Sequence, residues 1–556
     1  MTRLPLPFAA PLRTGCGRVN GRVGPQKKRV NIWYGRLDGL NLPQGGCFLR
    51  GGMSRRSPLK LKDVTRTTLL TLGTISLGLV TVSAQTFSVL HAFTNPANGT
   101  NQDGANPMTG LSSLGNVLCG TTVNGGRFRA GTIFYLDANG SDFNPFRAFT
   151  NSPDAGKPEA DVVVLGNSFY GTSFGGGAHG TGTVFTGQTN GTGPPVYSFA
   201  ALNADTATNA LGGSPSAPIV LAGSTFYGTA TAGGAYGNGV VFSGFTNNSS
   251  VLALHTFTAI DPVTGTNLDG ATPWGGLVLS GDTLYGTTLV GGAGGNGTVY
   301  SLNTNGSGFN TLYSFGAMDP VTGTNTDGAV PMNSLVLSNG KLYGTASVGG
   351  FGDSGTIFSV LTNGSEFSAL HHFTSVDFIT RTNSDGANPQ AALVLSGSTL
   401  YGTTPAGGVG AAGTIFSIRT NGSQFKSLYQ FTAASPATGT NSDGAFPVAA
   451  LLQSGSSLYG TTFGGGPGAA GTVFRFTLPT APAAITSIVR NSDGSVTLSF
   501  LGAANSTNIV QATTNLAAFA TWRNVSTNVA DAGGSWQCTD TATSPFPLQF
   551  YRSHSP

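Results

Sequence analysis

The chain has 556 residues, of which 85 are glycine and only 9% are charged, and its formal net charge is +4. The positive charge lies early in the chain: 14 of the 26 Lys and Arg but only 2 of the 22 acids precede residue 85, which leaves 12 basic and 20 acidic side chains in residues 85–556, a net charge of −8. Because modules that bind nucleic acids usually carry a basic face, this balance excludes a nucleic acid as the main partner.

Residues 1–84 are predicted to be a leader. Residues 1–52 are rich in Arg, Gly and Pro without periodicity, which indicates a disordered extension or a misassigned start. Residues 53–84 are typical of a signal peptide: a basic stretch precedes the apolar run "TTLLTLGTISLGLVTV", and Val82 and Ala84 occupy positions −3 and −1 of a cleavage site. A transmembrane anchor is the alternative, but the run is short. We therefore expect cleavage before Gln85, no transmembrane anchor afterwards, and a protein that is secreted or held at the cell surface.

Residues 85–479 contain seven copies of one unit. Each copy carries a Gly-Thr step, usually after an aromatic residue, and its glycines are Gly120, Gly171, Gly228, Gly286, Gly344, Gly402 and Gly460. The unit at 331–389 predicts four short strands, "SLVLS", "KLYGTAS", "GTIFSVL" and "FSALHHF", separated by turns and a glycine loop. Four antiparallel strands at a period of about 58 residues are typical of a β-propeller blade.

The two ends of the array predict how it closes. The seventh unit stops after its third strand at 471–476, whereas a strand of the missing type, "FSVLHAF", stands alone at 87–93. A ring closed by pairing the N-terminal strand into the last blade needs this split, and an open solenoid would leave its sheet edges exposed. We therefore predict an all-β fold, a closed seven-bladed propeller.

The remaining residues, 480–556, are predicted to be a linker and a small β-sandwich. Alternating apolar and polar residues mark five or six strands, such as "SVTLSFLG" and "TNIVQATTN". This part resembles the fibronectin-III-like C-terminal modules of bacterial surface proteins.

Glycine patterns in the units have structural explanations. Gly292, Gly294 and Gly297 satisfy the G-x-G-x-x-G pattern of dinucleotide-binding loops, but that loop needs a helix after it, and here the residues on both sides predict strands. The pattern also recurs in register in three further units, so we expect no nucleotide cofactor. Asn-Gly pairs between the third and fourth strands predict type I′ turns, at 139–140, 190–191, 305–306, 363–364 and 421–422.

Two blocks of the unit, "LYGTTxxGGxxGxGTVF" and "TNxDGAxP", resemble the GloVer-type (Gloeo/Verruco) extracellular tandem repeat of bacterial surface proteins. The resemblance implies export and surface display and no established activity. The array departs from the pattern in its first units: Cys119 replaces the usual Tyr, the second unit lacks "TNxDG", and the third has "TNALGGSP" in its place.

The "TNxDG" loops are the candidate metal sites. Asn-x-Asp-Gly is similar to the ligand spacing of a calcium loop, but no acidic ligand follows at position twelve, which is Val336 when counted from Asn325. The favoured interpretation is that Asn and Asp bind their own backbone and fix the turn, so we expect no bound metal, with calcium as the alternative. The candidate residues are Asn101, Asp103, Asn267, Asp269, Asn325, Asp327, Asn383, Asp385, Asn441 and Asp443.

No catalytic constellation is predicted. His91, His255 and His371 occupy one repeated slot, and the residues outside the repeat pattern are best interpreted as solvated loop residues: Arg127, Arg129, Glu159, Asp161 and His179. Two function classes stay open. The favoured one is an exported binding or structural module whose propeller face, carrying both the glycine loops and the "TNxDG" loops, recognises a glycan or a surface protein. The alternative is a polysaccharide-active propeller enzyme, a hydrolase or a lyase.

Overall fold

The computed structural model describes residues 85–554 except 97, 167, 189–192, 194, 248–249, 479–483, 503–506, 515–520, 532–533 and 543–548. The predicted leader, 1–84, and the Asn-Gly pair at 190–191 lie outside the described residues. All elements of the described part are β-strands, as the all-β prediction requires. A membrane-spanning helix is not found among them.

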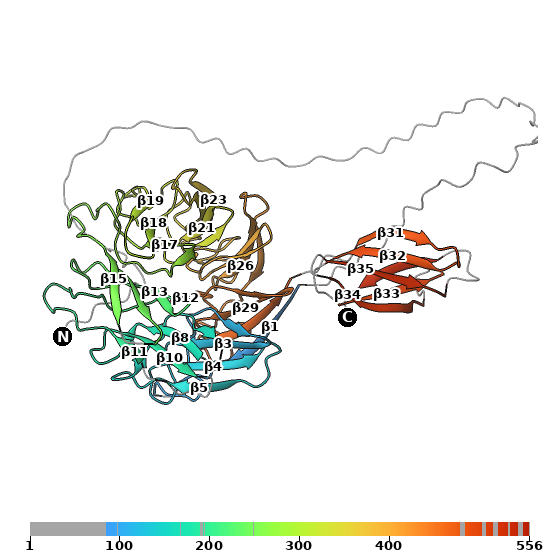
Figure 1. Cartoon of the computed structure of the whole chain (residues 1–556), viewed down its shortest axis with the longest axis horizontal. Helices are drawn as coiled ribbons and strands as arrows, with labels where there is room; N and C mark the ends of the chain where they lie inside the picture. Colours follow the sequence, from blue (N-terminus) through green and yellow to red (C-terminus); the bar gives the residue numbers. More distant parts are fainter. Residues whose placement is uncertain are drawn as a thin grey trace, which may run out of the picture. The chain divides into compact units, whose positions relative to one another are not determined.

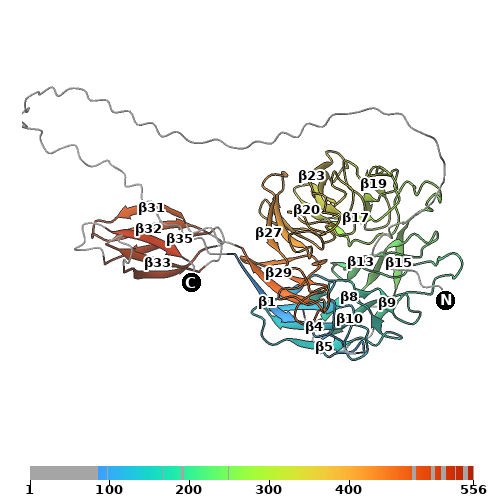
Figure 2. The same cartoon turned by 180° about the vertical axis from the view of Figure 1, so that it is seen from behind.

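Seven four-stranded antiparallel sheets follow one another along residues 86–477 (Figures 1 and 2). We number them in chain order. The first three consist of β2 (Ser112–Leu114), β3 (Val117–Thr122), β4 (Thr132–Asp137) and β5 (Asn144–Ala148); β7 (Val163–Leu165), β8 (Ser168–Ser173), β10 (Thr183–Gln188) and β11 (Pro195–Ser198); and β12 (Val220–Ala222), β13 (Thr225–Ala230), β14 (Val240–Phe245) and β15 (Val251–Thr256). A two-stranded pair, β6 (Ala155–Gly156) and β9 (Gly175–Gly176), accompanies the second sheet.

The next three sheets repeat this order. They consist of β16 (Val278–Ser280), β17 (Thr283–Thr288), β18 (Thr298–Asn303) and β19 (Asn310–Ser314); β20 (Val336–Ser338), β21 (Lys341–Ala346), β22 (Thr356–Leu361) and β23 (Ser368–His372); and β24 (Val394–Ser396), β25 (Thr399–Thr404), β26 (Thr414–Arg419) and β27 (Lys426–Gln430). The seventh sheet takes its outer strand from the other end of the array: β28 (Leu452–Ser454), β29 (Ser457–Thr462), β30 (Thr472–Thr477) and β1 (Thr86–Ala92).

The repeated Gly-Thr step places its glycine under an aromatic ring. In the fifth sheet Gly344 pairs with Phe358 on the neighbouring strand, and a Cβ on the glycine would lie 2.6 Å from that ring. Phe358 is fully buried, so the ring has no room to move away. The equivalent glycines meet the same ring in the other six sheets, and this close contact explains why the step recurs.

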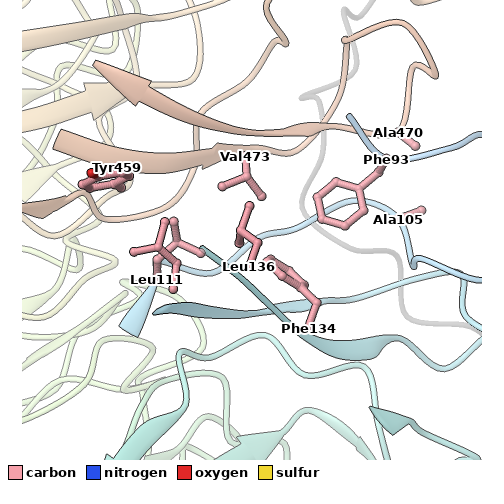
Figure 3. Close-up of a cluster of buried hydrophobic side chains, with 9 residues drawn as sticks. Phe93, Ala105, Leu111, Phe134, Leu136, Tyr459, Ala470 and Val473 are labelled. Carbon is pink, nitrogen blue, oxygen red and sulfur yellow. The ribbon is translucent and has the colours of Figure 1, made fainter. Parts of the chain in front are cut away.

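The split of the repeat predicts that β1 pairs with the last sheet, and the register of the two strands confirms this pairing. Phe87 pairs with Phe476 and Ala92 with Thr472. In both overall views β1 lies beside the strands of the seventh sheet (Figures 1 and 2). Phe93, which follows β1, packs in a buried cluster with Phe134 of the first sheet and Val473 of the seventh (Figure 3).

Neighbouring sheets are joined throughout the array by two repeated features. Seven buried apolar clusters each combine side chains of two neighbouring sheets, including the seventh with the first. In addition, the threonine of each Gly-Thr step donates its hydroxyl to a backbone carbonyl of the next sheet at 2.8–3.4 Å. In the last of these bonds Thr461 Oγ1 donates to the carbonyl of Thr109, 352 residues away along the chain.

One turn prediction is wrong. Gly140 has a positive φ of 93°, but Asn139 does not have a positive φ, so the turn is not type I′. Gly140 N–H donates to the Asp137 carbonyl, and Asp137 N–H to the Ser141 carbonyl, which is a three-residue hairpin with a bulge at the glycine. The physical reason is that the Asn139 side chain accepts the N–H of Ser141 at 2.8 Å, an Asx turn. The pairs at 305–306, 363–364 and 421–422 behave alike.

The C-terminal part contains two three-stranded antiparallel sheets. They are β31 (Ala484–Arg490), β32 (Val496–Leu501) and β35 (Ser535–Asp540), and β34 (Arg523–Val529), β33 (Thr507–Thr513) and β36 (Phe550–His554). Side chains of both sheets share one buried cluster, in which Phe500 stacks on Trp536 at 3.8 Å. The likeness to fibronectin-III-like modules stays a prediction.

Candidate functional site

The glycine loop and the loop after the fourth strand meet at one end of each sheet, which we call the loop end. Asn325 joins them: its Oδ1 accepts the N–H of Gly328 in its own loop at 2.9 Å and the N–H of Gly350 in the glycine loop at 2.8 Å. Its Nδ2 donates to the carbonyls of Gly328 and Gly316. The prediction that one end carries both loops is therefore confirmed. The same four bonds are made by Asn101, Asn209, Asn267, Asn383 and Asn441.

The aspartate of the motif makes different contacts from those that the sequence predicts. Asp327 does not bind its own turn; it accepts the N–H of Gly316 and the hydroxyl of Tyr313, both at 2.8 Å, from the preceding fourth strand and the residues after it. Turn fixing is thus correct for the asparagine and wrong for the aspartate, which fastens the loop to the preceding strand. The other aspartates receive the equivalent backbone N–H and are also buried, namely Asp103, Asp269, Asp385 and Asp443.

A further contact to each aspartate comes from the side chain in one slot of the fourth strand, two residues before the Phe that follows or ends it. His255 and His371 contact Asp269 and Asp385 at 3.0 and 3.1 Å, and His91 lies 3.4 Å from Asp103. Tyr313 and Tyr429 fill the slot in two other units. The repeated histidines therefore belong to carboxylate contacts that sequence reasoning did not find, because the two residues are 12–14 positions apart in the chain.

In the second unit the pair is Arg147 and Asp154, at 2.8 Å. This aspartate stands four residues before Pro158, like Asp103 before Pro107, and that spacing is the signal that could have revealed it despite the missing "TNxDG". In the third unit Leu211 occupies the aspartate position and Tyr197 the slot of the preceding fourth strand, and both pack against one buried apolar cluster.

These contacts bear on the calcium candidates, because the carboxylate oxygens accept hydrogen bonds from the protein itself. Burial alone would raise the pKa of Asp103, Asp269 and Asp385, but hydrogen bonds from the neighbouring His and Thr side chains outweigh it and lower the pKa below the ordinary value. The described residues contain no group of three His, Cys, Asp or Glu side chains placed to hold a metal ion.

Two acids outside the repeat lie on the segment that leads into the first strand of the second sheet. The expectation that they are solvated loop residues is wrong, because both residues are half-buried. Burial raises the pKa of Glu159 to about 7, with Lys157 lowering it in part. Burial likewise raises the pKa of Asp161 to about 6, and the N–H of Gly110, in the first sheet, donates to its carboxylate. Arg127, Arg129 and His179, in contrast, are exposed, as expected.

Aromatic side chains lie near this segment at the loop end. Phe174 begins the glycine loop of the second sheet, and its N–H donates to the carbonyl of Lys157 at 3.1 Å. Its ring lies 6.3 Å from that of Trp274, which precedes the first strand of the fourth sheet. Ser216, on the equivalent segment of the third sheet, donates its hydroxyl to the Trp274 carbonyl. Segments of the second, third and fourth sheets thus bring two acids and two aromatic rings to the loop end of these sheets.

The family model described as the Gloeobacter/Verrucomicrobia repeat matches residues 72–265, 256–437 and 320–521. The chain belongs to this family. A comparison with curated proteins gives no match to this Gloeobacter/Verrucomicrobia repeat protein.

Solved structures with similarity include an ulvan lyase of a new polysaccharide lyase family, at 10% identity and a TM-score of 0.39, covering 69% of this chain and 96% of the lyase. An oligogalacturonate lyase in complex with manganese has 9% identity and a TM-score of 0.38, with 72% and 98% covered. A putative 6-phosphogluconolactonase from Bacteroides uniformis has 15% identity and a TM-score of 0.38, with 60% and 88% covered. These similarities are too distant to carry any activity over to the repeat protein.

Proposed function

We propose that the seven sheets form a closed seven-bladed β-propeller, exported from the cell, that binds a partner through its loop end. Two observations support the ring: β1 completes the seventh sheet, and the Thr461–Thr109 bond repeats, between the last and first sheets, the bond that joins all other neighbours. A ring of this kind protects the two ends of the array from pairing with other chains.

The observation that carries the binding proposal is a set of exposed aromatic side chains on fastened loops. Phe128, Tyr236 and Phe351 lie in glycine loops, and Phe378 lies in the loop after β23; between 46% and 70% of each is exposed. The asparagine and aspartate bonds hold these loop types in place. Aromatic side chains on a rigid loop offer a large contact area at little cost in conformational entropy. Their flat faces fit sugar rings, so we propose a glycan as the partner, ahead of a surface protein.

A glycan array tests this proposal. The mature chain, residues 85–556, is compared with a variant in which Phe128, Tyr236, Phe351 and Phe378 are all alanine. A matched control is Phe245→Ala, because Phe245 is also exposed but ends β14 away from the loop end. We expect glycan signals for the wild type and the control and loss of those signals in the loop variant at an unchanged melting temperature. Equal signals for all three proteins would contradict recognition by the loop end, and no signal at all would refute a glycan partner.

Export has its own test. Mass spectrometry of the protein from the culture medium or the cell surface should give Gln85 as the first residue, because Val82 and Ala84 form the cleavage signal. Retention of residues 53–84 in the mature protein would indicate a membrane anchor instead.

One observation favours the enzyme alternative. The raised pKa values of Glu159 and Asp161 lie in the range that general acid–base catalysts use near neutral pH. Both acids, however, come from one segment of one sheet, two residues apart, whereas acid and base groups on different sheets would hold a substrate between them. Binding is therefore the function that the arrangement supports best.

A further inference from the structure

The segments before the seven first strands form two layers of residues that meet between neighbouring sheets. Counted from the glycine of the Gly-Thr step, the tenth residue back is Gly110 in the first sheet and Asp161 in the second. A Cβ on Gly110 would lie 2.8 Å from the Asp161 carboxylate and 3.1 Å from the Ala450 carbonyl of the seventh sheet. Gly276, at the same position of the fourth sheet, would likewise meet Ser334 and Pro218 of its two neighbours. In a closed ring these layers surround the central axis.

Only the second sheet places acids in these layers. The tenth residues back are Gly110, Asp161, Pro218, Gly276, Ser334, Ala392 and Ala450. The twelfth residues back are Met108, Glu159, Ser216, Trp274, Met332, Gln390 and Val448. A repeat array that serves packing alone has no need for two carboxylates at one point. The segment that carries them contacts the aromatic pair through its backbone, because the Phe174 N–H donates to the Lys157 carbonyl and the Phe174 ring lies 6.3 Å from that of Trp274.

These two carboxylates are half-buried and lack the side-chain partners that other acids of the array and of the C-terminal part have. Asp269 receives hydrogen bonds from His255 and Thr258, and Arg147 and Arg523 pair with Asp154 and Asp540. Neither Glu159 nor Asp161 takes part in an ion pair among the described residues. Lys157 affects Glu159 only through its charge, and Asp161 accepts one backbone N–H. A carboxylate that is partly removed from water and has no cation beside it is destabilised in its charged form, and a bound cation would relieve that cost.

We propose that Glu159, Asp161, Phe174 and Trp274, the axial cluster, bind the protonated amino group of an amino sugar polymer or a polyamine. The carboxylates supply the negative charge, and the faces of the two rings supply cation–π attraction and apolar contact for the carbons next to the nitrogen. A metal ion is a poorer fit, because two aromatic rings offer it no oxygen ligands. The inference deepens the proposed recognition function and rests on the closed ring.

Calorimetric titration of the mature chain tests the proposal with three probes: a glucosamine hexamer, its fully N-acetylated counterpart and spermidine. We expect the glucosamine hexamer to bind and the acetylated hexamer, which has no charged nitrogen, not to bind. Binding of spermidine as well would show that a free polyamine also serves as ligand, whereas the hexamer alone would show an amino sugar ligand. Equal binding of the two hexamers, or no binding of either amine, would overturn the proposal.

Variants locate the binding. Glu159→Gln and Asp161→Asn together should weaken the amine at least about tenfold, since each removes one charge contact, and Trp274→Ala should weaken it as well. The matched control is Glu366→Gln, an exposed acid beside Lys341, which should bind as the wild type does. The double variant should melt no lower than the wild type, because it removes two uncompensated carboxylates, so a loss of binding is not a loss of fold. Unchanged binding in the double variant would refute the assignment.

The two proposals can fail separately. The alanine variant of Phe128, Tyr236, Phe351 and Phe378 alters the exposed loops and leaves the axial cluster intact, so it should keep amine binding while it loses its glycan signals. If the amine fails to bind but the glycan signals still depend on those four residues, only the axial cluster is refuted. If the glycan signals fail but amine binding depends on Glu159 and Asp161, the loop surface is refuted and the axial cluster stands.

Discussion

Two tyrosines whose hydroxyls differ in their hydrogen-bond partners give predictions of opposite sign. Tyr300 is fully buried, its hydroxyl has no hydrogen-bond partner among the described residues, and it occupies the slot that is Phe in the other six sheets. Tyr313 donates its hydroxyl to the buried carboxylate of Asp327 at 2.8 Å. An unsatisfied buried polar group costs about 1–3 kcal/mol, so Tyr300→Phe should raise the free energy of unfolding by about that amount. Tyr313→Phe should lower it by a similar amount, because Asp327 loses a donor.

The assay is urea unfolding of the mature chain at pH 7, followed by tryptophan fluorescence, for the wild type and both variants. Identical chemistry, removal of one hydroxyl from a tyrosine, makes each variant the control for the other. A shift of both midpoints in the same direction would refute the reasoning, as would a loss of stability in Tyr300→Phe.

Three further predictions follow from the same contacts. Val330 has a φ of 61° in a slot where Asn106 and Asn388 have φ of 57°, and a β-branched residue is strained there, so Val330→Asn should raise the unfolding free energy by about 1 kcal/mol in the same assay. The pKa of Asp103, Asp269 and Asp385 is lowered in the folded state, so the native protein binds fewer protons than the unfolded chain. Their contribution to stability is therefore present above about pH 4 and is lost as the pH falls further. In urea unfolding, Asp269→Asn should lose less free energy of unfolding than the wild type between about pH 5 and pH 2. Asp327→Ala should lower the free energy of unfolding by about 1–3 kcal/mol, because it leaves the Gly316 N–H and the Tyr313 hydroxyl without their acceptor. The melting temperature of the wild type and of this variant should be the same in millimolar calcium as in a chelator. A calcium-dependent rise that Asp327→Ala abolishes would show a metal loop.

The strand order could be predicted from the sequence because the information is local and repeated. The Gly-Thr step, such as that of Gly344, and the apolar alternation around it recur at a fixed spacing, so each copy supports the prediction for the others. The solitary strand at 87–93 supplies the strand that the last unit lacks. Pairing of β1 with β30 followed from that count alone. The type I′ turn failed for a local reason: the Asn139 side chain competes for the Ser141 N–H, and the residue pair by itself does not reveal this competition.

The site could be predicted only in part, because its contacts join residues that are distant in the chain. The asparagine bonds to Gly328, three residues on, were accessible from turn chemistry. The aspartate bonds were not, since Asp327 reaches back 11 and 14 residues to a strand whose position depends on the packed sheet. Glu159 and Asp161 look like solvated loop residues in the sequence, but both are half-buried, and for Asp161 the close approach of Gly110 from the first sheet depends on how the sheets pack.

The pairing of the first strand with the last sheet is the central claim, because the closed ring and its axis depend on it. Ser88 of β1 and Arg475 of β30 are directly opposite partners, and opposite residues of antiparallel strands have Cα atoms about 4.5–5.5 Å apart, within reach of a disulfide. The double variant Ser88→Cys, Arg475→Cys is oxidised, digested and analysed by mass spectrometry without reduction. The closed ring predicts one intramolecular disulfide that links the peptides containing residues 88 and 475 in the monomer. Free thiols at both positions, or a disulfide found only between two chains, would contradict it.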